Sequence, residues 1–172
     1  WLLILMISSM ITGSILAKYE AAFAVIPLLV TFIPMLTDTG GNAGSQSATL
    51  VIRAMALGDV RLCWQDVWRV VRRELPVAAA LGLVVAGMET VLARFSKGIG
   101  LDVLLVVGLS MLVCTVLGGI IGVLLPFAAR RMGTDPATLS SPLITSVMDL
   151  VGVFIYFAFA YAFLGDLLRQ AG

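Results

Sequence analysis

Long runs of apolar residues constrain this chain more than any other feature of its sequence. Residues 103–129, for example, contain no charged side chain, and a helix needs about 20 apolar residues to cross the hydrocarbon core of a bilayer. Over the whole chain 60% of the residues are hydrophobic and 12% are charged, whereas a soluble domain carries about 25% charged residues. The composition therefore predicts a protein solvated by lipid.

Five segments are candidates for membrane spans. They are residues 1–17, 21–57, 76–95, 103–129 and 139–165, of which the second is long and interrupted. Backbone groups in lipid must be satisfied within a segment, and the chain lacks the ten-residue alternation of membrane barrels, so we expect helices. The predicted fold is an all-α membrane protein with five transmembrane helices.

Two local patterns support this division of the chain. Asp135 followed by Pro136 is typical of the start of a helix, with Asp135 as the N-cap. Gly118 and Gly122 form a pair of small residues four apart, a spacing that is common where membrane helices pack closely.

The connection at residues 59–75 differs from the other, short connections. Trp64, Trp68, Val71 and Leu75 recur at helical spacing on one face, whereas the arginines lie mostly on the other. This pattern is typical of an amphipathic helix in the membrane interface, with tryptophan at the depth of the headgroups. We expect such an interfacial helix here, in preference to a binding helix for a calmodulin-like partner.

Positive charge predicts the orientation of the chain. One predicted side of the membrane holds Arg53, Arg61, Arg69, Arg72, Arg73, Arg130 and Arg131, and the other holds Lys18, Arg94, Lys97 and Arg169. Basic residues are retained in the cytoplasm, so we expect a cytoplasmic N-terminus and an external C-terminus. The apolar run begins abruptly at Trp1 and lacks the basic segment of a signal peptide. We therefore expect a soluble cytoplasmic region to precede it.

Asp149 is the ionisable residue that lies deepest in a predicted span. A carboxylate there costs about 3 kcal/mol on insertion scales, and such residues indicate functional sites. Ser141, Thr145 and Gly152 share its helical face by their spacing. Hydrogen bonding between helices explains the two hydroxyls alone equally well. With Asp149 on the same face, we interpret the stripe as the wall of a water-filled path.

A second polar region follows Pro34, at residues 37–47. Its glycines allow the backbone to approach a neighbour or a ligand closely, and irregular backbone at membrane depth is tolerated where it is buried in protein or faces a cavity. Within this region Thr39, Asn42 and Gln46 share a face. Amide and carbonyl oxygens suit hard cations and their hydration water. We expect an interrupted helix beside a cavity, and not a mere connection between two short spans.

The side-chain chemistry favours a hard divalent cation. The chain contains no histidine, which disfavours a Zn²⁺ or Cu²⁺ site. One carboxylate per chain is too little to remove the water from a hard divalent cation, and Mg²⁺ keeps several waters in its sites. A two-fold dimer would place two copies of Asp149 near one axis, where they repel unless a cation lies between them. This reasoning does not separate Mg²⁺ from Mn²⁺ or Ca²⁺.

The glycine-rich string resembles the signature of the MgtE family of magnesium transporters and its eukaryotic solute-carrier relatives. The string reads Gly40-Gly41-Asn42-Ala43-Gly44-Ser45-Gln46-Ser47. Residues 133–137 and 141–149 resemble that family's last loop and helix, and the likeness extends over essentially the whole chain.

The resemblance implies a homodimeric Mg²⁺ channel whose pore is lined by the second and fifth helices, with Asp149 as its central cation-binding residue. It also implies cytoplasmic regulatory N and CBS domains, which lie outside this chain. The candidate cation contacts are Asp38, Gly41, Asn42, Ser141, Thr145 and Asp149.

Two other functions match parts of the sequence. Asp38-Thr39-Gly40 matches the tripeptide of aspartic proteases, and Asp149 could be a second intramembrane carboxylate. An ion-coupled secondary transporter also uses interrupted helices at the midplane, although no inverted repeat is evident. A net charge of +1 gives no surface for nucleic acid. The chain is therefore predicted to be a transport protein and not an enzyme.

Overall fold

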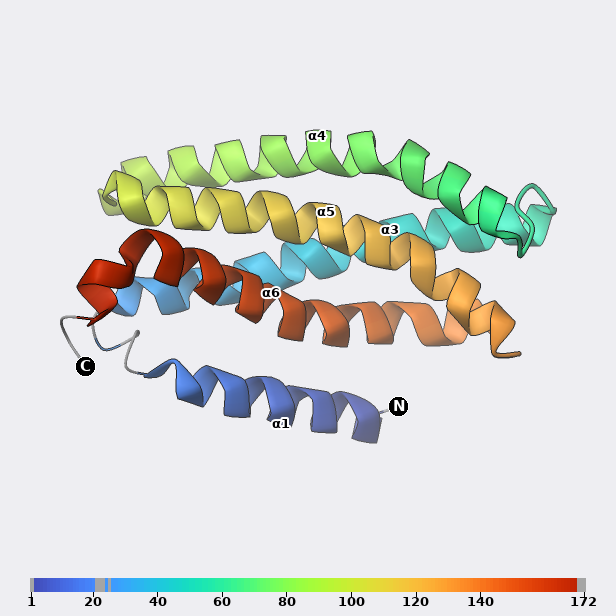
Figure 1. Ribbon diagram of the computed structural model, residues 1–172, viewed down its shortest axis with the longest axis horizontal. Helices are drawn as coiled ribbons and strands as arrows, with labels where there is room; N and C mark the ends of the chain where they lie inside the picture. The colour runs from blue at the N-terminus through green and yellow to red at the C-terminus, as the bar shows by residue number, and fades with distance from the viewer. Residues whose placement is uncertain (1, 21–23, 25, 170–172) are drawn as a thin grey trace.

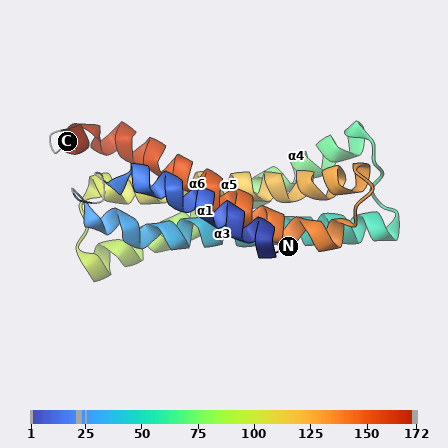
Figure 2. The same cartoon turned by 90° about the horizontal axis from the view of Figure 1, so that it is seen from below.

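The computed structural model describes residues 2–20, 24 and 26–169, and these residues form an elongated bundle of helices (Figures 1 and 2). The elements are α1 (Leu2–Lys18), the 3₁₀ helix η1 (Pro27–Phe32), α3 (Ile33–Leu57), α4 (Trp64–Lys97), α5 (Leu101–Arg131) and α6 (Pro136–Arg169). The described residues contain no strand, so the predicted all-α class is confirmed.

Three helices in the described part of the chain are long and apolar enough to cross a membrane. They are Trp64–Phe95, Leu101–Arg131 and Pro142–Gly165, which correspond to the third, fourth and fifth predicted spans. Leu5–Lys18 is a shorter apolar helix. The first two spans therefore remain predictions.

The prediction of a separate interfacial helix at residues 59–75 is wrong, because α4 runs without a break from Trp64 to Lys97. Pro76 lies inside it and removes one backbone hydrogen bond. The helix continues because Val67, Val71 and Ala78, which share one face, are all buried in the protein. Burial on both sides of the proline holds the two halves in one helix, and the tryptophans of the predicted apolar face remain exposed.

The glycine-rich string does not interrupt its helix. The prediction of an interrupted helix at residues 37–47 is therefore wrong. Residues 37–47 lie within the continuous helix α3, and the interruption falls earlier, at η1. Pro27 and Pro34 occupy the first turns of η1 and α3, where a missing N–H is tolerated. The glycines thus serve the packing of a regular helix.

Four glycines bring the backbones of α3 and α5 into direct contact. A Cβ atom on Gly44 would lie 2.7 Å from the carbonyl oxygen of Gly118, and one on Gly40 would lie 3.2 Å from that of Cys114. The relation is reciprocal, because Cβ atoms on Gly118 and Gly122 would overlap the carbonyl oxygens of Gly40 and Gly44. Side chains at these four positions would force the helices apart.

The helix α5 is the centre of the bundle, since it packs against α3, α4 and α6 (Figure 1). On the other side, the Tyr156 hydroxyl of α6 donates a hydrogen bond of 3.0 Å to the carbonyl oxygen of Leu29 in η1. The Tyr19 ring stacks on Phe157 with centroids 3.9 Å apart. These contacts hold η1 and the end of α1 against α6.

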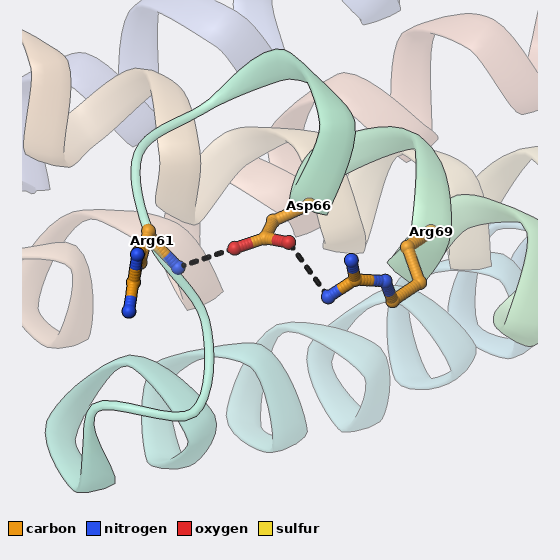
Figure 3. A network of polar contacts seen from close by, with 3 residues as sticks. All are labelled: Arg61, Asp66 and Arg69. Atoms are coloured by element: carbon orange, nitrogen blue, oxygen red, sulfur yellow. Dashed lines mark hydrogen bonds and ion pairs between the residues drawn. The ribbon is translucent and has the colours of Figure 1, made fainter.

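The turn between α3 and α4 is fixed by one carboxylate (Figure 3). Asp66, in the first turn of α4, accepts a hydrogen bond of 3.0 Å from the backbone N–H of Arg61, and its other oxygen lies 2.7 Å from Arg69 Nη1. Gly58 ends α3 with a φ of 80°, a conformation that glycine adopts without strain.

The predicted helix start at Asp135 is confirmed. Its carboxylate accepts hydrogen bonds from the backbone N–H of Ala137 at 3.1 Å and from the Thr138 hydroxyl at 2.9 Å. Pro136 begins α6.

The glycine contact predicts that Gly122→Ala destabilises the bundle by about 2 kcal/mol, as expected when an added methyl group has no space. Gly87→Ala is the matched control, because a Cβ there meets nothing within 4 Å. Unfolding in detergent micelles should show a lowered transition only for Gly122→Ala. Equal stability of the two variants would contradict close packing of α3 on α5.

Candidate functional site

The polar residues of α3 face away from its glycines. Gly40 and Gly44 are buried against α5, whereas Asp38, Asn42 and Gln46 are exposed. The Asn42 side-chain amide donates a hydrogen bond of 3.0 Å to the Asp38 carboxylate. Further along the helix the Thr49 hydroxyl donates to the carbonyl oxygen of Ser45 at 2.8 Å. A shallow groove follows this face, lined by Asn42, Ser45, Gln46, Thr49 and Leu50.

Asp149 of α6 lies beside the start of this face. It is half-buried, and the Thr37 hydroxyl of α3 hydrogen-bonds its carboxylate while the charge of Asp38 is close enough to act on it. Thr37 also lies 3.2 Å from the carbonyl oxygen of Pro34, and one hydroxyl proton can serve only one of these acceptors at a time. The structure thus brings the two carboxylates of Asp38 and Asp149 into one neighbourhood.

Close packing of α3 on α6 sets this arrangement. A Cβ on Gly41 would lie 3.7 Å from Thr145 Cα and 3.9 Å from its hydroxyl oxygen. A Cβ on Gly152 would lie 3.2 Å from the methyl group of Thr37. Gly41 is therefore a buried contact between the helices, and it places the exposed Thr145 next to α3.

The structure describes the surroundings of five of the six predicted cation contacts. Asp38, Asn42, Thr145 and Asp149 reach the surface of the chain, Gly41 is buried, and the side chain of Ser141 lies outside the described residues. Within the described part of the chain, no three carboxylate, cysteine or histidine side chains converge as a metal site would require. The oxygen atoms that do gather between α3 and α6 are carboxylate, amide and hydroxyl oxygens, which hard cations prefer.

One polar contact inside the bundle was not predicted from the sequence. The buried Ser47 hydroxyl of α3 forms a short hydrogen bond to the Glu74 carboxylate of α4, and it also lies 3.1 Å from the carbonyl oxygen of Ala43. The signal was present, since Glu74 shares a helical face with the buried Val67 and Val71. A carboxylate on the buried face of an amphipathic helix indicates a partner inside the protein.

We predict that Ser47→Ala destabilises the protein by about 1–3 kcal/mol, because Glu74 loses its donor in a half-buried position. Thr49→Ala is the matched control, since the Thr49 hydroxyl is exposed. Denaturation of both variants in micelles measures the difference. In a double-mutant cycle, Ser47→Ala should cost much less when Glu74 is already leucine; strictly additive losses would contradict the pairing.

Comparison with known proteins assigns the chain to a family. Residues 33–159, from the first residue of α3 to near the end of α6, match the sequence profile of MgtE, described as a divalent cation transporter. This chain belongs to the MgtE family. The prediction of the family from the glycine-rich string is thereby confirmed.

Three relatives carry the same name, magnesium transporter MgtE. The protein from Thermus thermophilus is 39% identical over 161 residues, which cover 93% of this chain and 35% of the relative. The protein from Bacillus subtilis is 30% identical over 167 residues (97% and 36%), and that from Enterococcus faecalis is 31% identical over 164 residues (95% and 36%). This chain therefore spans about a third of the length of these relatives.

Proposed function

We propose that this chain is the transmembrane, ion-conducting domain of a Mg²⁺ channel or transporter. The observation that carries the proposal is that Asp149 lies at the junction of α3 and α6, in the neighbourhood of the Asp38 carboxylate and at one end of a polar face on α3. The similarity to magnesium transporters supports Mg²⁺ as the transported ion.

The ion passes as a hydrated cation. Mg²⁺ gives up its water reluctantly and is held in proteins through one or two carboxylates and water. Asp38 and Asp149 supply the charge that attracts it. Because the Asn42 amide nitrogen donates to Asp38, its side-chain oxygen can accept a hydrogen bond from the hydration shell.

A homodimer completes the path. The groove on α3 is open on one side, and a second copy related by a two-fold axis would close it with an identical face. Two copies of Asp149 would then face one axis, with the cation between them relieving their repulsion. Thr145, and Ser141 by its helical spacing, would extend the polar wall along α6.

The proposed topology has five spans, with α1 and α3 in addition to the three apolar helices. The helix α3 has 25 residues, which at about 1.5 Å per residue is long enough to cross the hydrocarbon core. The arginine-rich turns favour a cytoplasmic N-terminus and an external C-terminus. Regulatory N and CBS domains in the longer protein would then be cytoplasmic.

Asp149→Asn should reduce Mg²⁺ uptake into proteoliposomes at least about tenfold, the factor that corresponds to a loss of 1.4 kcal/mol in cation binding. Asp102→Asn is the control, because Asp102 is an exposed carboxylate in the first turn of α5. Unchanged uptake in Asp149→Asn would remove this residue from the path. Wild-type uptake that requires an imposed proton gradient would favour coupled transport over a channel.

The dimer predicts that cysteine at position 42 of one copy lies near its counterpart. In a Cys63→Ser background, where the buried Cys114 is retained, a short bifunctional thiol reagent should link Asn42→Cys into dimers in membranes. Val84→Cys, which is exposed on α4, should remain monomeric on a denaturing gel. Linking of both positions, or of neither, would count against a two-fold axis at the α3 face.

A further inference from the structure

A crevice between α3 and α4 adjoins the polar groove of α3 at Leu50 but is otherwise lined by different residues. Most of its wall is apolar, with Leu50, Val51 and Ala54 from α3 and Val70 and Val77 from α4, and its volume is about 360 Å³. The crevice exists because α3 and α4 each pack on α5 and touch each other little. It has the apolar wall that a hydrocarbon chain requires.

Two arginines and two tryptophans place the mouth of this crevice near the membrane surface. Trp64 and Trp68 are 69% and 49% exposed, and exposed tryptophan prefers the headgroup region of a bilayer. The Arg72 guanidinium lies 5.1 Å from the centre of the Trp68 ring. The next residue, Arg73, lines the crevice itself.

Arg73 forms no ion pair within the described part of the chain. Arg69, by contrast, is paired with Asp66 (Figure 3). Glu74, the acidic residue of the crevice wall, is bonded to Ser47 on α3. An exposed guanidinium beside an apolar crevice is therefore available to an anion at the surface, and guanidinium groups bind phosphate through paired hydrogen bonds.

More positive charge surrounds this end of the bundle. The helix α3 carries Arg53 near its end, and α5 ends with Arg130 and Arg131. In Figure 1 the α3–α4 turn and the end of α5 lie at the same end of the molecule. Such a cluster attracts anionic lipid at the cytoplasmic surface.

We propose that this crevice binds an anionic phospholipid, with one acyl chain between α3 and α4 and the headgroup phosphate at Arg73. A zwitterionic lipid carries the same hydrocarbon but no net charge, so anionic lipid is preferred. The bound chain fills the gap beside the Ser47–Glu74 contact, on the side of α3 that faces away from α6.

Native mass spectrometry of the full-length protein, released from nanodiscs of phosphatidylglycerol and phosphatidylcholine in equal amounts, tests this site. The wild type should retain phosphatidylglycerol preferentially. Arg73→Ala should weaken that retention about fivefold, as expected for one basic residue near anionic lipid. Arg131→Ala is the matched control, because Arg131 belongs to the same basic end of the bundle but does not line the crevice; it should weaken retention much less than Arg73→Ala does.

A second variant separates the crevice from the general effect of charge. Val77→Trp places a bulky side chain in the crevice and leaves every arginine in place, and it should also lose the retained lipid. Equal losses in Arg73→Ala and Arg131→Ala would overturn the site in favour of a diffuse basic surface. Retention of phosphatidylglycerol by Val77→Trp, or linking of Val77→Cys to a second copy in membranes, would also overturn it.

Discussion

The contact between the glycines of α3 and α5 is the constraint on which the rest of the structure depends. Lipid provides no hydrophobic force that drives helices together, so membrane helices rely on close van der Waals packing. Gly40 and Gly44 meet Gly118 and Gly122 at distances that leave no space for a methyl group on any of them. This contact fixes how α3 is rotated about its own axis.

Because of this rotation, the packing residues and the polar residues of α3 lie on different faces of the helix. With the glycine face turned to α5, the residues between the glycines in sequence point elsewhere. Gly41 meets Thr145 of α6, and Asp38 and Asn42 reach the surface beside Asp149. On a third side, Ser47 bonds to Glu74 of α4. A single short stretch of sequence therefore packs on three helices and still presents a polar face.

Much of this arrangement could be predicted from the sequence where local chemistry decides it. The three apolar helices, the helix start at Asp135 and the packing role of Gly118 and Gly122 all follow from short-range patterns, and each is confirmed. The proximity of Asp38 to Asp149 does not follow from local patterns, since it depends on how α3 and α6 pack.

The errors have one physical origin, which is that tertiary burial overrides local signals. Pro76 and the arginines around it favour an end to the helix, yet burial of Val71 and Ala78 keeps α4 continuous. The glycines of α3 favour irregular backbone, yet their contact with α5 requires a regular helix. The contact between Ser47 and Glu74 was not predicted, because the two residues lie 27 positions apart in the sequence.

The central claim is that the polar face of α3 lines a water-filled path for Mg²⁺. The accessibility of introduced cysteines tests this claim most directly. In the Cys63→Ser background, cysteines introduced one at a time at Gln46 and Thr49 of α3, and at Leu83 and Leu92 of α4, would be exposed to a small cationic thiosulfonate in proteoliposomes. All four native side chains are exposed in the chain, so exposure alone does not distinguish them. The account predicts fast modification at the α3 positions, slowed by millimolar Mg²⁺, and little reaction on α4. Equal rates on both helices, or α3 rates that Mg²⁺ leaves unchanged, would contradict it.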